Sequence, residues 1–404
     1  MLLGRFYDAL ELHREEKIIY GLFLRPHLVV STSRAGGGQR GDLKYLANHQ
    51  GCEPAAHSHN VSAAMEPVSY QSTVCARYGL DPESCALLGT AANMRLCSVK
   101  SETFRGLTVV AAVTGGVESN AGRAGDRAYI WEGPLGYESL PKEGDELQSE
   151  EGEAHISPND PSKQGTINTL LFIGQPLTPG ALVRTIMTAT EAKTAVLQQL
   201  AVNSRYSDGL ATGTGTDQIG VASLIDNNLR PITGAGKHSK LGELIALVVM
   251  AALKEVLIRQ NGMTLDRQCS IKIHIERFAK TSPGRYGLKT EELLSLIAKY
   301  LDKEQEALMR ANYRALFHDP LHVSQVAAMA HLKDKFAWGI LPASLYGEVM
   351  SLQASNLAVA VSGHPDYFKR YYALFSDPAP ENSNINFLNL AARALALGFG
   401  DKWL

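Results

Sequence analysis

The sequence predicts an α/β or α+β protein in which a mixed sheet is flanked by helices, followed by a mainly helical C-terminal appendage. Two β-branched apolar runs, residues 107–113 and 169–174, are typical of buried strands. The stretch LGELIALVVMAALKEVLIRQNG is typical of a long helix that ends near Asn261 and Gly262. From Met263 onward most of the chain has helical patterning, interrupted by Pro, Gly and Asp.

Composition and charge narrow the class of protein. The chain has 404 residues, 45% hydrophobic and 20% charged, which is usual for a globular protein with a sizeable core. A net charge of −2 gives no basic field, so we expect neither nucleic acid nor an anionic membrane as partner. The apolar run at residues 244–253 is too short to span a bilayer, and the N-terminal segment lacks a secretory signal's apolar core. Five cysteines with no CxxC pair favour reduced thiols and a cytoplasmic setting.

The N-terminal part contains strands and loops. Residues 17–24 and 27–32 are strand-like runs separated by Pro26, and a glycine-rich loop follows at residues 34–42. Residues 133–163 are rich in Glu, Asp, Pro, Ser and Gly. Such a composition buries little apolar area, so we expect a mobile acidic insertion, with an acidic binding face as the alternative.

Helix signals, and a change to mainly helical patterning, divide the rest of the chain. Thr178 and Pro179 supply the N-cap and first residue of a helix, and residues 219–224 predict a strand after it. The change near residue 262 predicts a domain of residues 1–262 and an extension of unknown role at residues 263–404. Within the extension, the alternating run SIKIHIERF, residues 270–278, predicts a strand.

Threonine and glycine alternate at residues 212–216, which raises the question of a phosphate-binding loop. A Walker A motif requires glycine where Pro231 stands and a hydroxyl residue where His238 follows Lys237. The Thr-Gly stretch itself has no lysine and leads into a strand, so nucleotide hydrolysis is disfavoured. The stretch offers closely spaced backbone N–H groups and three hydroxyls, which can hold amide or carbonyl oxygens. A tight strand-entry loop with solvent-facing threonines is the alternative.

The helix that begins at Pro179 has a lysine on its apolar stripe. At about 100° per residue, Lys193 shares a stripe with five apolar residues. They are Leu182, Ile186, Ala189, Val196 and Leu200. A lysine on a buried face needs an anion or a polar cavity, so Lys193 is a candidate site residue; a snorkelling side chain is the alternative. Glu191 projects to the opposite side, where an exposed ion pair is ordinary.

Three further groups are candidates. Asn120, Arg123 and Asp126 follow the strand at residues 107–113, and ligands often bind at such strand ends; a capped turn is the alternative. A second group permits a zinc site or a Cys–His nucleophile, although its spacing matches no template and a polar loop is the simpler interpretation. Its members are His49, Cys52, Glu53, His57 and His59. His318 and His322 flank a helix start, where histidines are common without metal.

Six segments gain meaning when they are considered together. They are STSRAGGGQRGDLKYLANHQGCEP, VTGGVESNAGRAGD, GTINTLLF, TATEAKTAVLQQL, SDGLATGTGTDQIGVAS and GAGKHSKLGELI. In this order, across roughly residues 15–260, they resemble the adenosylcobinamide amidohydrolases of corrinoid salvage. The combination of TEAK, ATGTGTD and GKHSKLGE is the most specific part of the resemblance.

The resemblance implies hydrolysis of the aminopropanol amide of adenosylcobinamide to adenosylcobyric acid, as a step of cobalamin biosynthesis. A corrinoid is a broad apolar ring edged by amides, so neutral donors and acceptors are expected to bind it. The candidate substrate-binding residues are Asn120, Arg123, Asn168, Thr190, Thr212, Gly213, Thr214, Gly215, Thr216 and His238. We expect no cofactor, because the cobalt belongs to the substrate, and the sequence sets neither a metal requirement nor an oligomeric state.

Amide hydrolysis needs an activated nucleophile, a stabiliser for the oxyanion and an acid for the leaving amine. The candidate catalytic residues are Lys193, Asp217, Asp126 and Glu191. We expect Asp217 or Asp126 to act as general base, and the N–H groups of residues 213–215 with Arg123 to stabilise the oxyanion. Lys193 would donate a proton or hold the carboxylate. The alternatives are a corrinoid-binding protein without catalysis and an amidohydrolase of the same fold for another amide-rich substrate.

Overall fold

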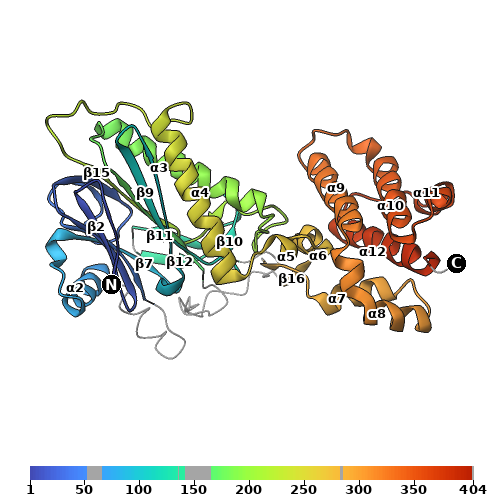
Figure 1. Ribbon diagram of the computed structural model, residues 1–404. Helices are drawn as coiled ribbons and strands as arrows, with labels where there is room; N and C mark the ends of the chain where they lie inside the picture. Colours follow the sequence, from blue (N-terminus) through green and yellow to red (C-terminus); the bar gives the residue numbers. More distant parts are fainter. Residues whose placement is uncertain (52–65, 135, 142–164, 283–284, 403–404) are drawn as a thin grey trace. The chain divides into compact units, whose positions relative to one another are not determined.

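The structure, a computed structural model, describes residues 1–51, 66–134, 136–141, 165–282 and 285–402 (Figure 1). The chain forms two compact units. The first unit comprises Met1–Gly125, Glu151–Val202 and Ala211–Met263, and the second comprises Asp126–Glu150, Asn203–Leu210 and Thr264–Leu404. Mixed sheets flanked by helices confirm the predicted α/β class. Most of the expected acidic insertion at residues 133–163 lies outside the described residues.

One sheet of the first unit has five strands in the order β1-β2-β3-β6-β7. Strands β6 and β7 are parallel, and the other neighbours are antiparallel. The strands are β1 (Leu2–Phe6), β2 (Leu10–Glu15), β3 (Ile18–Phe23), β6 (Tyr45–Gln50) and β7 (Cys85–Thr90). The predicted strand at residues 17–24 is therefore confirmed as β3.

The second sheet has six strands in the order β5-β4-β15-β13-β9-β8, and it contains the remaining strands predicted for this unit. Only β13 and β15 are parallel neighbours among its pairs in the described residues. The strands are β4 (His27–Ser31), β5 (Gly38–Arg40), β8 (Ser98–Phe104), β9 (Leu107–Gly115), β13 (Ile167–Ile173) and β15 (Gln218–Leu224). The antiparallel partner of β13 on its other side is β9, so β13 lies within the sheet.

Side-chain alternation along the strands divides the first unit into four layers. Leu46 packs into the apolar core between the two sheets, whereas its neighbour Ala47 packs against α2 (Pro67–Arg77) on the outer face. The six-stranded sheet buries its other face against α3 (Pro179–Gln199) and α4 (Lys240–Asn261), which lie side by side in Figure 1. The order is thus helix, sheet, sheet, helix pair.

Local signals set the ends of the two long helices as the sequence predicts. The Thr178 hydroxyl accepts a hydrogen bond from the Ala181 N–H at the start of α3, and Pro179 occupies the first helical position. Gly262 ends α4 in the left-handed conformation, with φ of 62°. Helix α3 therefore begins, and α4 ends, at the predicted residues.

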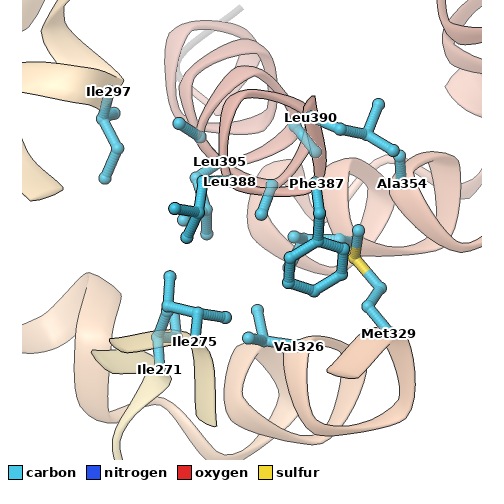
Figure 2. Close-up of a cluster of buried hydrophobic side chains, with 14 of the residues drawn as sticks. Ile271, Ile275, Ile297, Val326, Met329, Ala354, Phe387, Leu388, Leu390 and Leu395 are labelled. Atoms are coloured by element: carbon cyan, nitrogen blue, oxygen red, sulfur yellow. The ribbon is translucent and has the colours of Figure 1, made fainter. Parts of the chain in front are cut away.

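The second unit is mainly helical. Its helices are α5 (Leu265–Gln268), α6 (Ile271–Ile275), α7 (Thr290–Ala298), α8 (Lys303–His318), α9 (Pro320–Ala337), α10 (Tyr346–Ser362), α11 (Phe368–Ser376) and α12 (Asn384–Asp401). It also contains two short hairpins, β11 (Ile130–Gly133) with β12 (Gly136–Ser139) and β16 (Lys280–Ser282) with β17 (Arg285–Tyr286). Figure 2 shows its core, in which Phe387 of α12 lies near Val326 and Met329 of α9. The predicted helical character of this part is confirmed.

The predicted strand at residues 270–278 is wrong. The segment forms α6 and then a 3-10 helix, η4 (Glu276–Phe278). The isoleucines at 271 and 275 are fully buried in the core of the second unit, whereas Ile273 is only half-buried. Isoleucines at every second position also provide an i, i+4 pair, so the run fits one turn of helix as well as a strand.

Candidate active site

The candidate site lies where three neighbouring strands of the six-stranded sheet meet. Strands β13 and β15 begin at Ile167 and Gln218, and the antiparallel β9 ends at Gly115, opposite Ile167. The loop after β9 and the Thr-Gly loop before β15 pair through β10 (Ala121–Gly122) and β14 (Gly213–Thr214). The sequence therefore brings two of its predicted loops together at one end of the sheet.

Lys193 of α3 and Asp217 form an ion pair at this end. Each side chain is only 15% exposed. The predicted burial of Lys193 on the apolar stripe is thus confirmed, and its counter-ion is Asp217. A carboxylate is required there because an unpaired ammonium is costly to bury.

Asp217 also holds the backbone around it. Its Oδ1 accepts hydrogen bonds from the Ile167 N–H at 2.9 Å and from the Thr214 hydroxyl at 2.5 Å. Its Oδ2 accepts the Thr214 N–H at 3.0 Å in addition to the Lys193 ammonium. A carboxylate offers about four acceptor positions, so these four donors occupy it. Asp217 is therefore built to position the loop and Lys193.

Glycine is required beside this pair. A Cβ at Gly213 would collide with Oδ2 of Asp217 and would lie 2.8 Å from Nζ of Lys193. The Thr212 backbone N–H bonds to the Gly122 carbonyl at 2.9 Å, and its hydroxyl accepts the Ala124 N–H at 2.8 Å. These contacts fix the Thr-Gly loop against the loop after β9.

A second group of contacts surrounds the peptide bond that precedes β13. The Gly165 carbonyl accepts hydrogen bonds from Nδ2 of Asn120 at 3.0 Å and from the Thr216 hydroxyl at 3.1 Å. The hydroxyls of Thr216 and Thr166 are also hydrogen bonded to each other. Thr166 is buried, and the sequence reasoning did not select it, although GTINTLLF begins at Gly165.

A buried amide network joins the two sheets next to this group. Nδ2 of Asn168 donates to Oδ1 of Asn48 and to the Gly89 carbonyl, both at 2.8 Å. Oδ1 of Asn168 accepts the Gln218 N–H at 3.2 Å, and Gln218 in turn accepts the Gly89 N–H at 2.8 Å. Nδ2 of Asn48 donates to the Thr114 hydroxyl at 2.9 Å.

Asn168, a candidate substrate-binding residue, belongs to this network. Asn168 is fully buried, and both of its N–H groups are engaged within the protein. Its amide therefore has no donor left for a ligand. Asn168 is part of the bridge between the sheets, and its role in substrate binding stays a prediction.

The other predicted residues lie at the surface or in the second unit. Glu191 pairs with Lys237 at 2.7 Å in an ion pair whose side chains are 48% and 62% exposed, as periodicity predicts for this face. Thr190, His238 and Arg123 are exposed. Asp126 belongs to the second unit, where its carboxylate accepts the Ser204 hydroxyl at 2.6 Å. Of the four predicted catalytic residues, the structure shows Lys193 and Asp217 in direct contact.

The described histidines form no metal site with other described residues. Of the group around residues 49–59, only His49 is described, because residues 52–65 lie outside the described part. Nδ1 of His49 is 2.6 Å from the Tyr70 hydroxyl, and burial lowers the pKa of His49 to about 4. His318 and His322 interact through Nδ1 with the Cys269 and Leu316 carbonyls. No group of three His, Cys, Asp or Glu residues within the described ranges is arranged to hold a metal ion.

Comparisons with known proteins place the chain in a family. The model of the adenosylcobinamide amidohydrolase (CbiZ) family matches residues 4–265. An uncharacterized protein of Methanocaldococcus jannaschii is 34% identical over 228 residues, which cover 55% of this chain and 80% of that protein. No helix in the described residues is long and apolar enough to cross a membrane.

Two solved structures are similar over most of the chain at 13% identity each. The PH0078 protein of Pyrococcus horikoshii OT3 has a TM-score of 0.27, with 71% of this chain and 86% of that chain covered. The L-aminopeptidase D-Ala-esterase/amidase of Ochrobactrum anthropi has a TM-score of 0.26, with 72% and 91% covered. The family match extends over more than half of the chain and confirms the resemblance inferred from the six motifs. The chain belongs to the adenosylcobinamide amidohydrolase family.

Proposed function

We propose that this protein hydrolyses the aminopropanol amide of adenosylcobinamide and releases adenosylcobyric acid. The observation that carries the proposal is the family match over residues 4–265, which includes Lys193, Asp217 and the Thr-Gly loop. Membership of this family suggests an amidohydrolase. The substrate, its place in corrinoid salvage and cobalamin biosynthesis, and a cytoplasmic setting are parts of the proposal.

The chemistry of the site supports amide hydrolysis. Lys193 supplies a positive charge in a largely buried position, where a charge interacts strongly with a developing oxyanion or a leaving amine. Gly215 and Thr216 are exposed, so their backbone groups are available to the amides at the edge of a corrinoid. The Thr216 hydroxyl is already bonded to the Gly165 carbonyl and to the Thr166 hydroxyl. Since the four acceptor positions of Asp217 are occupied, we assign it a positioning role in place of the general-base role expected from sequence.

The remaining candidates are proposed as binding groups at the periphery. Thr190, Glu191 and His238 are exposed residues of the matched family motifs. Arg123 is also exposed and directly follows β10, the strand that pairs with the Thr-Gly loop. Thr212, Gly213 and Thr214 shape the loop through their contacts with Asp217 and the loop after β9. We propose no protein-bound cofactor, because the cobalt belongs to the substrate.

Mass spectrometry of adenosylcobinamide incubated with the purified chain tests the proposal. We expect adenosylcobyric acid and free aminopropanol, with and without a chelator. Lys193→Met should reduce turnover by at least about 100-fold, as expected when a charged stabiliser of the transition state is lost. Lys254→Met is the matched control, because Lys254 is an exposed lysine of α4 outside the six motifs.

The outcomes separate the competing functions. Retention of corrinoid without product would favour a binding protein, and product only from another amide would favour a different substrate. Loss of activity with chelator, restored by a metal ion, would contradict the absence of a cofactor. Wild-type turnover in Lys193→Met would remove Lys193 from the chemistry.

A further inference from the structure

The peptide bond between Gly165 and Thr166 has the surroundings of a reacting bond. Two donors, Nδ2 of Asn120 and the Thr216 hydroxyl, converge on the Gly165 carbonyl oxygen at 3.0 and 3.1 Å. Two donors on one carbonyl oxygen are the arrangement that stabilises the oxyanion of a tetrahedral intermediate. The hydroxyl of the next residue, Thr166, lies in the same hydrogen-bonded group.

The direction of donation between the two threonine hydroxyls follows from their contacts. Each threonine hydroxyl has one proton to donate. When Thr216 donates to the Gly165 carbonyl, its bond with Thr166 requires Thr166 to be the donor. The Thr216 oxygen is then positioned to accept the Thr166 proton as the Thr166 oxygen attacks.

The backbone on both sides of the bond is fixed. Gly165 has φ of 151°, and a Cβ there would lie 2.8 Å from the Gly116 carbonyl oxygen. The Thr166 carbonyl accepts the Gly116 N–H at 3.1 Å. The following N–H, of Ile167, is held by Asp217, which also holds Lys193. Such preorganisation is costly to build and is expected where a chain reacts at one defined bond.

We propose that the chain cleaves its own Gly165–Thr166 peptide bond, and that the new N-terminal Thr166 is the nucleophile of the amidohydrolase. The second half of this inference rests on the proposed function. An N-terminal threonine suits the task, because its own α-amine can accept the proton of its hydroxyl.

Self-cleavage proceeds in two balanced steps. Oγ1 of Thr166 attacks the Gly165 carbonyl carbon, and its proton passes through Thr216 to the Thr166 nitrogen as the C–N bond breaks. The product is an ester between Gly165 and Oγ1 of Thr166, with a free α-amine. One water molecule then hydrolyses the ester and leaves the Gly165 carboxylate and the free Thr166 hydroxyl.

Substrate hydrolysis repeats the same chemistry on the bound amide. The α-amine of Thr166 takes the hydroxyl proton, and Oγ1 attacks the amide carbonyl. The proton goes to the departing amine, and a second water molecule hydrolyses the acyl ester to the carboxylic acid. Lys193, held by Asp217 beside the start of β13, contributes positive charge to this region.

Intact-mass measurement and N-terminal sequencing of the purified chain test self-cleavage without any corrinoid. We expect two chains, residues 1–165 and 166–404, with Thr166 as the new N-terminus. Thr166→Ala should remain one chain and lack turnover, whereas Thr166→Ser should cleave and retain activity. Thr73→Ala is the matched control, because Thr73 is an exposed threonine of α2 and should cleave like the wild type.

A graded variant keeps the test independent of misfolding. Thr216→Val removes a donor to the Gly165 carbonyl and the acceptor of the Thr166 proton, so cleavage should slow by about 10²–10³-fold. Circular dichroism of each variant checks that the fold is kept. Unchanged cleavage in a folded Thr216→Val protein would contradict the proposed proton route.

The outcomes distinguish this inference from the proposed function. Uncleaved wild-type chain that turns over adenosylcobinamide would overturn the inference and leave the function in place, as would full turnover in Thr166→Ala. Cleavage at Thr166 without corrinoid turnover would support self-cleavage and count against the substrate.

Discussion

Replacement of Asp217 by Asn tests whether the Lys193–Asp217 pair holds the first unit together at the site. Asn keeps the size of the side chain but replaces one acceptor oxygen by a donor. The Lys193 ammonium and a backbone N–H that now bond to the carboxylate would then lose an acceptor. Removing one partner of a buried ion pair costs about 3–5 kcal/mol, and with both side chains only 15% exposed we expect a loss in that range.

The same helix provides a matched comparison. Glu191 and Lys237 also form a carboxylate–lysine pair, but their side chains are 48% and 62% exposed. Exposed pairs contribute about 0–1 kcal/mol, so Glu191→Gln should change the unfolding free energy little. The double variant Lys193→Met/Asp217→Asn should recover part of the loss, because it leaves no unpaired charge.

The assay must report on the first unit alone. The two described tryptophans, Trp131 and Trp338, belong to the second unit, so their fluorescence in urea is an internal control that should not change. Hydrogen exchange at β13 and β15 reports on the site end of the first unit. The variants are compared in a Thr166→Ala background, so that every chain is unbroken. A loss for Asp217→Asn no larger than that for Glu191→Gln would refute the reasoning.

Three further predictions concern acid stability, the second unit and the Thr-Gly loop. Burial lowers the pKa of His27 and of His49 to about 4, so the stability from their neutral imidazoles is complete above the unfolded pKa near 6.5 and is lost as pH falls from there through about 4. Each neutral imidazole contributes at most about 3 kcal/mol to the unfolding free energy. In urea unfolding measured at several pH values, the unfolding free energy of His49→Gln should fall less between pH 6.5 and 4 than that of the wild type. An equal fall in both proteins would contradict this. Phe387→Ala should destabilise the second unit by about 3–5 kcal/mol, seen as an earlier tryptophan transition, while an unaltered midpoint would remove Phe387 from its core. Thr214→Val should weaken corrinoid binding, because the hydroxyl bond that shapes the loop around Asp217 is lost; unchanged affinity in a titration excludes that role.

Local signals predicted the elements that depend on local physics. The Thr178 cap and the Gly262 stop specify helix ends by themselves, and their helices begin and end where the sequence indicates. The strand predicted for the isoleucine run at 271–275 was wrong, because the residues fit the spacing of a strand and of a helix equally well and tertiary packing decided between the two. Division of the strands between two sheets was not predicted, since strand order depends on contacts between distant segments.

The candidate site was predictable to the extent that it depends on periodicity. The helical period predicts that Lys193 is buried and needs an anion. The period cannot identify that anion, because Asp217 comes from another part of the chain. Thr166 shows no such signal, because a threonine before an apolar run is typical of an ordinary strand. Its distinguishing partner, Thr216, is 50 residues away, so only the folded chain identifies the group.

The amide bridge between the sheets implies that folding must precede the proposed cleavage. Asn48 and Gly89 come from one sheet and Asn168 and Gln218 from the other, next to the residues that hold the start of β13. Asp217 and Thr216 reach that start only when β13 and β15 have paired. A nascent or misassembled chain therefore lacks the reactive arrangement. Cleavage after Gly165, as proposed, would mark those copies whose two sheets have met, so that maturation itself would serve as a checkpoint on folding.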